Sequence, residues 1–261
     1  MGETGKHKIA LLLNREMAAR VIGDEGFAFL RTWATFQEPR DLPEIMTIDY
    51  MQAHAKQAEA CITCWGTPGF NEKVLAEATD LKLIAHAAGS VKGLVSEGVW
   101  ARKIRVTSAA PVIATDVAET TLGLIIVSLK RIWSQAAFTK AGGWRQPGEI
   151  DRMKRLKGLT VGVIAASSCG RNLIKLLQSF EVKILLYDPF VSAAQAEALG
   201  AQKVTLEELM ARSDVVTLHA PDLPANRHMI NAQNLALLKD NSLFINTARG
   251  ALVDEEALVA E

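Results

Sequence analysis

The sequence has no excess of charge of either sign and no apolar run long enough to span a bilayer. Its 261 residues include 29 lysines and arginines and 29 aspartates and glutamates, so the formal charge is zero. A neutral chain lacks the basic surface that nucleic-acid binding requires, so we expect no nucleic-acid partner. The longest nearly apolar run, Leu122 to Leu129, is shorter than the roughly 20 residues of a transmembrane helix. We therefore predict a cytoplasmic protein without a membrane partner.

Cysteine is also scarce, with only Cys61, Cys64 and Cys169 in the chain. An odd number of cysteines is typical of a reducing compartment rather than of a disulfide framework. Cys61 and Cys64 form a C-x-x-C pair, which leaves two interpretations open: buried core thiols, or a redox or zinc site. The pair lies in an apolar run that predicts a buried strand, where positions three apart face opposite sides. This favours core thiols, and we predict no metal site.

What the sequence does contain is a regular alternation of short apolar runs and amphipathic stretches. In the first hundred residues, strands are expected at 8–13, 60–65, 81–86 and 104–107, and helices at 24–31, 49–56, 71–78 and 91–100. In the later part, strands are expected at 160–165, 183–187, 215–219 and 242–246, and helices at 169–180, 192–199, 206–211 and 232–238. Strands that alternate with helices predict an α/β protein with two doubly wound parallel sheets.

One long helix separates the two parts. Apolar and small residues recur at helical spacing from Asp116 to Phe138, over about six turns. We predict that this helix connects two domains, residues 1–112 and residues 113–261. Its wide apolar stripe fits an interface between two copies of the chain, but burial within one chain explains the stripe equally well.

The second part begins with the elements of a dinucleotide-binding site. The strand at 160–165 runs into a short turn and a helix, and the next strand closes with Asp188. Backbone amides at a helix N-terminus bind pyrophosphate, and an acid about 20 residues further on binds the ribose. Asp188 would repel a 2′-phosphate, which favours NAD over NADP. We expect cofactor contacts from Ala166, Ser167, Ser168, Cys169, Gly170 and Asp188.

The glycine fingerprint of this turn is incomplete. Where the pattern G-x-G-x-x-G has its three glycines, the chain has Ala165, Ser167 and Gly170. Only the glycine that lets helix and strand pack closely is therefore present. A non-glycine residue held at positive φ costs about 1–2 kcal/mol, so we expect weakened cofactor binding. Taken alone, this segment also fits an ordinary βαβ unit that binds no nucleotide.

Two further strands end at the same edge of the predicted sheet. One closes with Leu-His-Ala-Pro at 218–221, and the other with Asn-Thr-Ala-Arg-Gly at 246–250. In open α/β sheets, ligands bind outside the carboxyl ends of the strands. We therefore expect additional cofactor contacts from His219, Ala220, Pro221, Thr247, Ala248 and Arg249.

Together these segments resemble the D-isomer-specific 2-hydroxyacid dehydrogenase family. The run NTARGALVD at 246–254 is similar to the family's arginine signature, and LHAP at 218–221 followed by MIN at 229–231 is similar to the preceding segment. DVAE at 116–119 resembles the start of its interdomain helix, and AGSVK at 88–92 its substrate loop. The resemblance implies a flavodoxin-like substrate domain, a Rossmann NAD-binding domain, NAD as cofactor, a small 2-keto or 2-hydroxy acid as substrate, and a homodimer.

By this resemblance, Arg249 binds the carboxylate and carbonyl of a 2-keto acid. A planar guanidinium matches a carboxylate and polarises the adjacent carbonyl toward hydride attack. An arginine that ties a loop to a helix end is the alternative. Substrate contacts are also implied for Ala88, Gly89, Ser90, Val91 and Trp65. A simple tight turn at 88–91, and a core tryptophan at 65, are the alternatives for these residues.

The resemblance also implies a proton donor that this sequence does not contain. In the family, a histidine oriented by a glutamate follows the arginine signature, whereas the last histidine here is His228. We do not assign this role to His219, and His86, on a strand near the substrate loop, is kept only as a minor alternative. We expect His7, His54 and His228 at the surface. We therefore expect a dehydrogenase whose second domain is incomplete. A catalytically silent NAD-binding or regulatory protein, an inactive fragment and a purely structural α/β protein are the alternatives.

Overall fold

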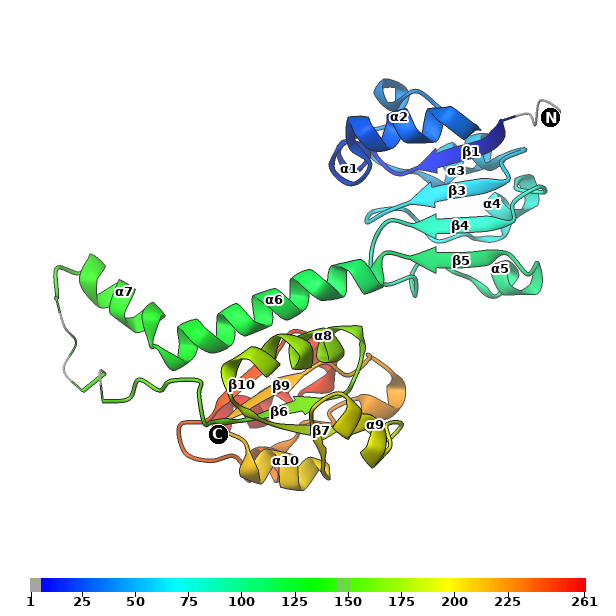
Figure 1. Ribbon diagram of the computed structural model, residues 1–261. Coiled ribbons are helices and arrows are strands. Elements are labelled where there is room, and N and C mark those ends of the chain that lie inside the picture. Colours follow the sequence, from blue (N-terminus) through cyan, green and yellow to red (C-terminus); the bar gives the residue numbers. More distant parts are fainter. Residues whose placement is uncertain (1–5, 145, 147, 150) are drawn as a thin grey trace. The chain divides into compact units, whose positions relative to one another are not determined.

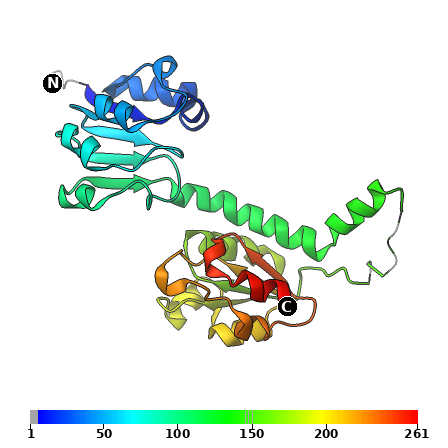
Figure 2. The same cartoon turned by 180° about the vertical axis from the view of Figure 1, so that it is seen from behind.

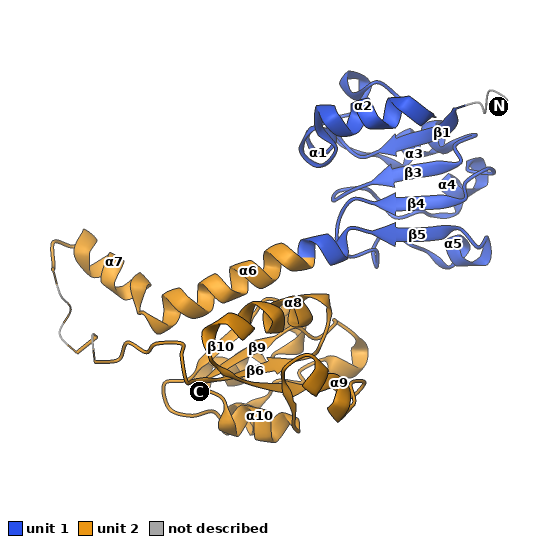
Figure 3. Ribbon diagram, in the orientation of Figure 1, with its two compact units in different colours: residues 1–113 blue, residues 114–261 orange. Residues whose placement is uncertain are grey.

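The protein consists of two compact units, residues 1–113 (unit 1) and residues 114–261 (unit 2), shown in Figures 1 and 3. The structure is a computed structural model that describes residues 6–144, 146, 148–149 and 151–261. Each unit contains a five-stranded sheet in which every paired strand runs parallel to its neighbour. The prediction of an α/β protein with two parallel sheets is therefore confirmed.

Unit 1 has the strand order β2-β1-β3-β4-β5, which is the flavodoxin-like order. Its strands are β1 (His7–Leu12), β2 (Ala34–Thr35), β3 (Ala60–Thr63), β4 (Leu83–His86) and β5 (Arg105–Ser108). Its helices are α1 (Arg15–Val21), α2 (Gly23–Trp33), α3 (Ile48–Ala55), α4 (Glu72–Glu77) and α5 (Glu97–Ala101), with a 3-10 turn η1 (Pro39–Asp41). Leu11 packs with residues of α1 and α2, and Leu12 packs with residues of α3 to α5. Successive residues of β1 thus face opposite helical layers.

Unit 2 has the order β10-β9-β6-β7-β8, which matches five strands of the Rossmann order 3-2-1-4-5-6 when β6 is counted as the first. Its strands are β6 (Thr160–Ile164), β7 (Lys183–Tyr187), β8 (Gln202–Lys203), β9 (Val215–Leu218) and β10 (Leu243–Asn246). Its helices are α8 (Ser168–Leu177), α9 (Ala193–Ala198), α10 (Leu206–Arg212), α11 (Ala232–Leu235) and α12 (Glu255–Ala260). Three 3-10 turns, η2 (Gln178–Phe180), η3 (Pro224–Asn226) and η4 (Gly250–Leu252), complete it.

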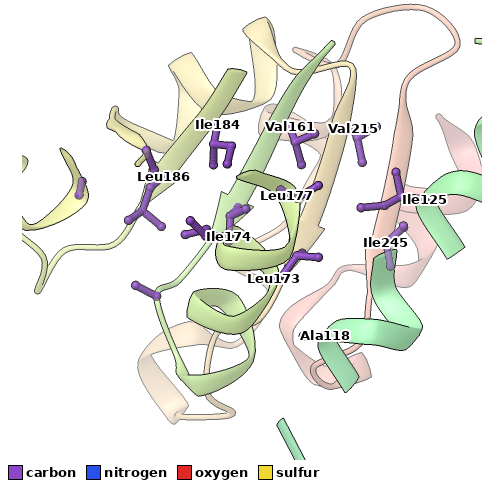
Figure 4. Close-up of a cluster of buried hydrophobic side chains, with 14 of the residues drawn as sticks. Ala118, Ile125, Val161, Leu173, Ile174, Leu177, Ile184, Leu186, Val215 and Ile245 are labelled. Carbon is purple, nitrogen blue, oxygen red and sulfur yellow. The ribbon is translucent and has the colours of Figure 1, made fainter. Parts of the chain in front are cut away.

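The core of unit 2 fixes the sheet edge on which the predicted site lies. Figure 4 shows Val161, Val215 and Ile245 of the sheet facing a layer of buried side chains from α8 and α6. The opposite face of the sheet packs against α10, α11 and the segment that leads into α12. Figures 1 and 2 show these two layers, with α8 nearer the viewer in the first and the red C-terminal segment nearer in the second.

The prediction of one continuous helix from Asp116 to Phe138 is wrong. The structure contains α6 (Ala110–Leu129) and α7 (Ile132–Lys140), and the helix breaks at Arg131, whose φ is +56°. Arg131 is anchored there because its guanidinium donates two hydrogen bonds to Glu149, at 2.8 and 3.2 Å. The break thus coincides with a tertiary ion pair and not with a glycine or proline.

Among the described residues, α6 is the one helix long and apolar enough to cross a membrane by length and composition. This is weak evidence, because core helices of globular proteins meet the same criteria. Ala118, Ile125 and Leu129 of this helix are buried in the core of unit 2. The absence of a membrane partner remains a prediction.

The cysteine pair occupies two different layers of unit 1, as the strand pattern predicts. Cys61 packs with residues of α3 to α5, and Cys64 packs with residues of α1 and α2. Both thiols are buried, and all three cysteines of the chain are free. Burial raises the pKa of Cys61 to about 12, so this thiol stays protonated at neutral pH.

Candidate functional site

The turn between β6 and α8 has the shape of a dinucleotide-binding turn. Ala165 follows the last residue of β6 and has a φ of +74°, a left-handed conformation that favours glycine. A Cβ atom at Gly170 would lie 2.1 Å from the carbonyl oxygen of Ala165, so only glycine fits there. The helix start therefore packs directly on the strand end, as the last glycine of the fingerprint permits.

Asp188 lies at the end of β7, next to this turn. Its Oδ2 accepts a hydrogen bond from the Ala166 amide at 2.8 Å, and its Oδ1 accepts one from the Phe190 amide at 2.8 Å. A pocket of about 460 Å³ borders the carboxylate and is lined in part by Pro189 and Val204. Asp188 is thus held in a fixed orientation beside open space.

The N-terminus of α8 completes the arrangement. Ser167 is the N-cap residue, and its hydroxyl accepts a hydrogen bond from the Gly170 amide at 3.4 Å. The guanidinium of Arg171 donates to the Ala166 carbonyl at 2.8 Å and braces the turn. A tight turn, a capped helix N-terminus and a fixed acid are the features that bind a dinucleotide, so these residues fit NAD. The strained Ala165 and Ser167 stand where the G-x-G-x-x-G pattern has glycine, and these two residues depart from an optimal turn.

His219 is buried at the end of β9 and joins the neighbouring strand ends in a polar network. Its Nε2 lies 2.9 Å from Thr217 Oγ1, and its Nδ1 lies 3.3 Å from both Cys169 Sγ and Thr247 Oγ1. Burial lowers the pKa of His219 to about 4, so the ring is neutral at pH 7. Burial also raises the pKa of Cys169 to about 11. Both groups are therefore uncharged at neutral pH. The His219 ring links the end of β9 to the start of α8 through Cys169, and to the loop after β10 through Thr247.

Arg249 follows β10 and is exposed. Its Nη1 donates to the carbonyl of Ala248 at 2.7 Å. The Asn246 side chain shapes this loop, because it accepts from the Ala248 amide at 2.9 Å and donates to the Arg249 carbonyl at 3.0 Å. No carboxylate forms a salt bridge with Arg249 in the part of the chain that the structure describes. The guanidinium is therefore available to an anionic ligand.

The predicted substrate loop of unit 1, Ala88 to Val91, follows β4. Ala88 is buried, whereas Ser90 is exposed. The amide of Ala109, just after β5, donates to the carbonyl of Ala88 at 3.0 Å. Trp65 follows the adjacent strand β3 with 49% of its surface exposed. The alternative of a core tryptophan at this position is therefore wrong.

The other histidines lie away from these strand ends, with one exception. His7 and His228 are exposed, as expected. His54 is half-buried and stacks on Tyr50 with ring centroids 3.8 Å apart, so its expected surface position is only partly correct. His86 is buried at the end of β4, beside the predicted substrate loop.

Sequence reasoning missed several residues that hold the site together. Thr217 and Thr63 contact the buried histidines His219 and His86. The sequence does carry a signal for Asn246, because an asparagine in a turn commonly bonds the backbone two residues on. Thr217 has a local signal too, because it lies two residues before His219 and therefore on the same face of the strand. Thr63 has none, because its contact with His86 depends on how β3 aligns with β4.

The comparison with protein families matches residues 122–261 to the D-isomer specific 2-hydroxyacid dehydrogenase, NAD binding domain. Among curated proteins, the chain is 33% identical over 219 residues to a D-3-phosphoglycerate dehydrogenase of Methanocaldococcus jannaschii, covering 82% of this chain and 40% of the relative. It is 31% identical over 210 residues to a glyoxylate reductase of Thermococcus litoralis, covering 78% of this chain and 63% of the relative. The chain thus spans less than two thirds of the length of these relatives.

Among solved structures, the apo-structure of D-lactate dehydrogenase from Escherichia coli matches with a TM-score of 0.72 and 25% identity. The match covers 97% of this chain and 77% of that one. The similarity to this structure therefore covers both unit 1 and unit 2.

Proposed function

This chain belongs to the D-isomer specific 2-hydroxyacid dehydrogenase family, and from this premise we propose that its full-length protein is an NAD-dependent oxidoreductase. The reaction interconverts a small D-2-hydroxy acid and its 2-keto acid by hydride transfer. We assign NAD binding to unit 2 (residues 114–261) and substrate binding to unit 1 (residues 1–113), whose division lies one residue from the predicted boundary between 112 and 113. The arginine and acid at the carboxyl edge of the unit 2 sheet support this assignment.

NAD, when bound, supplies the hydride for reduction or accepts it for oxidation. We assign its binding to the β6–α8 turn, with Ala166, Ser167, Ser168, Cys169 and Gly170 at the pyrophosphate. Asp188 binds the ribose hydroxyls through its fixed carboxylate. Residues His219, Ala220, Pro221, Thr247, Ala248 and Arg249 border the same edge of the sheet.

Arg249 holds the substrate and activates it. Its guanidinium pairs with the carboxylate and draws electron density from the adjacent carbonyl, which makes the carbonyl carbon a better hydride acceptor. In unit 1, Ala88, Gly89, Ser90 and Val91 bind the carboxylate through backbone amides, and Trp65 lies beside them on the next strand. We assign no proton donor among these residues, because His219 is neutral and already contacts three side chains.

The observation that carries the proposal is the exposed guanidinium of Arg249, which donates to the Ala248 carbonyl in a loop that Asn246 shapes, at the sheet edge where the dinucleotide turn lies. The test uses the full-length protein with Arg249→Gln and Arg249→Lys. We expect kcat/KM for a 2-keto acid to fall by roughly 10²–10³-fold, because the interaction with the reacting carbonyl is lost.

The control for this test is Arg212→Gln, which removes an exposed arginine of α10 whose side chain bonds Gln202. NADH affinity, measured by calorimetric titration, is expected to stay the same in Arg212→Gln and to fall far less than kcat/KM in the two Arg249 variants. Unchanged turnover in Arg249→Gln contradicts the role of Arg249. Binding of NADH without turnover by the unmodified protein contradicts the proposed activity.

We also propose that the protein is a cytoplasmic homodimer that associates through α6 and α7. Ile132 and Trp133 at the start of α7 are 45% and 63% exposed, and exposed apolar side chains of this size are typical of an interface. Sedimentation of the full-length protein tests this. A dimer that Trp133→Glu converts to a monomer supports the proposal, and a monomeric wild type contradicts it.

A further inference from the structure

The loop after β10 carries a hydroxyl that lies between two other parts of unit 2. Thr247 is half-buried, and its Oγ1 lies 3.3 Å from Nδ1 of His219, at the end of β9. The same oxygen lies 3.4 Å from Oγ1 of Thr121 in α6. His219 and Thr121 are both buried. Because Thr247 precedes Arg249 by two residues, it joins the loop of the candidate substrate arginine to a strand end and to a helix.

Thr121 sets the direction of the hydrogen bond that it shares with Thr247. The Thr121 hydroxyl donates to the Val117 carbonyl, one turn back in α6, at 2.7 Å. A threonine hydroxyl has a single proton, so Oγ1 of Thr121 can only accept at its second contact. The Thr247 hydroxyl is therefore the donor to Thr121, and its oxygen accepts from the His219 ring. Nδ1 of His219 must then carry a proton.

The other side of the ring leads to the same result. Burial lowers the pKa of His219 to about 4, so the ring is neutral at pH 7 and carries one proton. Nε2 lies 2.9 Å from Oγ1 of the buried Thr217, and in the part of the chain that the structure describes it is the one hydrogen-bond partner of that hydroxyl. A proton on Nε2 would leave the Thr217 hydroxyl as a buried donor without an acceptor, which is unfavourable. Nε2 is therefore the acceptor, and Nδ1 holds the ring proton.

Other hydrogen bonds of this loop act at different points. The ladder between β9 and β10 holds its beginning, and the Asn246 side chain closes the loop on itself by donating to the Arg249 carbonyl. The Leu252 amide donates to the same carbonyl at 3.3 Å and holds the far end. Among the described residues 246–250, Thr247 is the one whose side chain bonds both the end of β9 and α6. Its hydroxyl therefore ties the loop to the layers beside it.

We propose that the hydrogen-bond chain from Thr217 through His219 and Thr247 to Thr121 positions the loop of Arg249. His219 acts in the form protonated at Nδ1, and Thr247 continues the chain into α6. The chain sets how the loop lies against β9 and α6, and thereby where the guanidinium stands. Thr217 and Thr121 are fully buried, so they act on Arg249 only through the other members. This inference rests on the proposed role of Arg249 in binding a 2-keto acid.

The position of the ring proton tests the chain without any turnover. The full-length protein is labelled with ¹⁵N-histidine, and the signals of His219 are those that disappear in His219→Asn. Nε2 couples to both carbon-bound ring protons, whereas Nδ1 couples strongly only to Hε1, so a long-range proton–nitrogen spectrum tells the two nitrogens apart. We expect the proton on Nδ1 at pH 7, which is the opposite of the preference of free histidine. A proton on Nε2 overturns the proposal.

Four variants of the full-length protein test the effect on the reaction. Thr121→Val and Thr247→Val each remove one hydroxyl of the chain and change the side-chain shape very little. We expect each to lower kcat/KM for a 2-keto acid by roughly tenfold, because the guanidinium is less well placed. Thr247→Ser keeps the hydroxyl and should stay closer to wild type than Thr247→Val. Thr160→Val is the control, because Thr160 begins β6 at the opposite end of the sheet.

A double variant separates the chain from independent contacts. Thr121→Val combined with Thr247→Val should lose no more than the larger single loss, because both changes remove the same hydrogen bond. NADH affinity, measured by calorimetric titration, should fall less than kcat/KM. Wild-type kcat/KM in Thr121→Val, additive losses in the double variant, or equal losses in Thr247→Val and Thr247→Ser would overturn the proposal.

Hydrogen exchange reports the position of the loop independently of activity. The Leu252 amide bonds the Arg249 carbonyl, so its exchange depends on where the loop lies. We expect this amide to exchange faster in Thr121→Val than in the wild type, and at the wild-type rate in Thr160→Val. If the wild type shows no turnover, the proposed function fails, while the ring proton and this exchange rate still decide the role of the chain. Wild-type exchange in Thr121→Val overturns that role.

Discussion

Ala165 is a residue whose backbone conformation conflicts with its side chain. Its φ of +74° is required by the turn from β6 into α8, since the Ala165 carbonyl must pack against Gly170. Ala165→Gly removes a strain of about 1–2 kcal/mol and adds about 0.5–1 kcal/mol of chain entropy to the unfolded state. We expect a net gain of about 0.5–1 kcal/mol in urea unfolding, together with tighter NADH binding.

The matched control is the next residue. Ala166 has the same side chain and no positive φ, so Ala166→Gly is expected to lose about 0.5–1 kcal/mol. If both glycine variants lose stability equally, Ala165 is not strained.

His219 links the stability of the protein to pH. Its folded-state pKa of about 4 lies below the ordinary 6.5, so the unfolded chain binds the proton first as the pH falls. Stability is therefore lost between about pH 6.5 and pH 4, by an amount on the order of 3 kcal/mol. We expect His219→Asn to flatten this part of the curve of unfolding free energy against pH.

His228→Asn is the control for this prediction. His228 is exposed and has a φ of +48°, a conformation that asparagine tolerates, so the substitution should keep the wild-type slope. A wild-type slope in His219→Asn would show that other groups cause the acid sensitivity.

Among the elements, the junction of α6 and α7 depends on one buried carboxylate. Glu149 accepts hydrogen bonds from Arg131 and from the Ser134 hydroxyl, the latter at 2.8 Å. The bond from Arg131 is the main cause that lowers the pKa of Glu149 below 4.5. A carboxylate with a lowered pKa stabilises the fold above pH 4.5, and this contribution is lost as the pH falls through the folded-state value.

We therefore expect Glu149→Gln to lower the Tm at pH 7, and the difference from wild type to shrink below pH 4.5. Glu181→Gln serves as the control, because Glu181 pairs with Lys157 on the open surface, where an ion pair contributes little. Thermal unfolding of both variants across this pH range measures the effect. Equal Tm losses in the two variants would contradict a special role of Glu149.

The elements that the sequence predicted well are the ones with a strong local signal. The central strands are continuous apolar runs because parallel sheets are buried on both faces, and β6, β7 and β9 lie where expected. The edge strands β2 and β8 were not predicted, because a strand of two residues is too short to show any periodicity in the sequence. The break at Arg131 was equally hidden, because it coincides with a tertiary ion pair to Glu149 and not with a local glycine or proline.

The same distinction holds for the site. Asp188 was predictable because its distance along the chain from the β6–α8 turn is set by the βαβ unit itself. The contact between His86 and Thr63 was not predictable, since it depends on the alignment of β4 with β3. Motifs therefore predicted the candidate site residues, whereas strand register determined the contact between Thr63 and His86.

For the whole molecule, the strand orders of the two sheets agree with the assignment of the chain to the 2-hydroxyacid dehydrogenase family. A flavodoxin-like unit and a Rossmann-like unit occur together here, and the family match covers the second of them. The match with D-lactate dehydrogenase extends over 97% of the chain. Both units therefore have counterparts in a dehydrogenase, and a purely structural α/β protein does not account for these similarities.

The most direct test of this account is an enantiomer assay on the full-length protein. Purified protein is given NAD⁺ and either the D- or the L-form of small 2-hydroxy acids such as lactate and glycerate, and NADH formation is followed by absorbance. We expect NADH to form with at least one D-acid and not with its L-enantiomer, and the product to be the 2-keto acid. Absence of NADH formation with every D-acid of the panel, or equal rates with both enantiomers, would contradict the account.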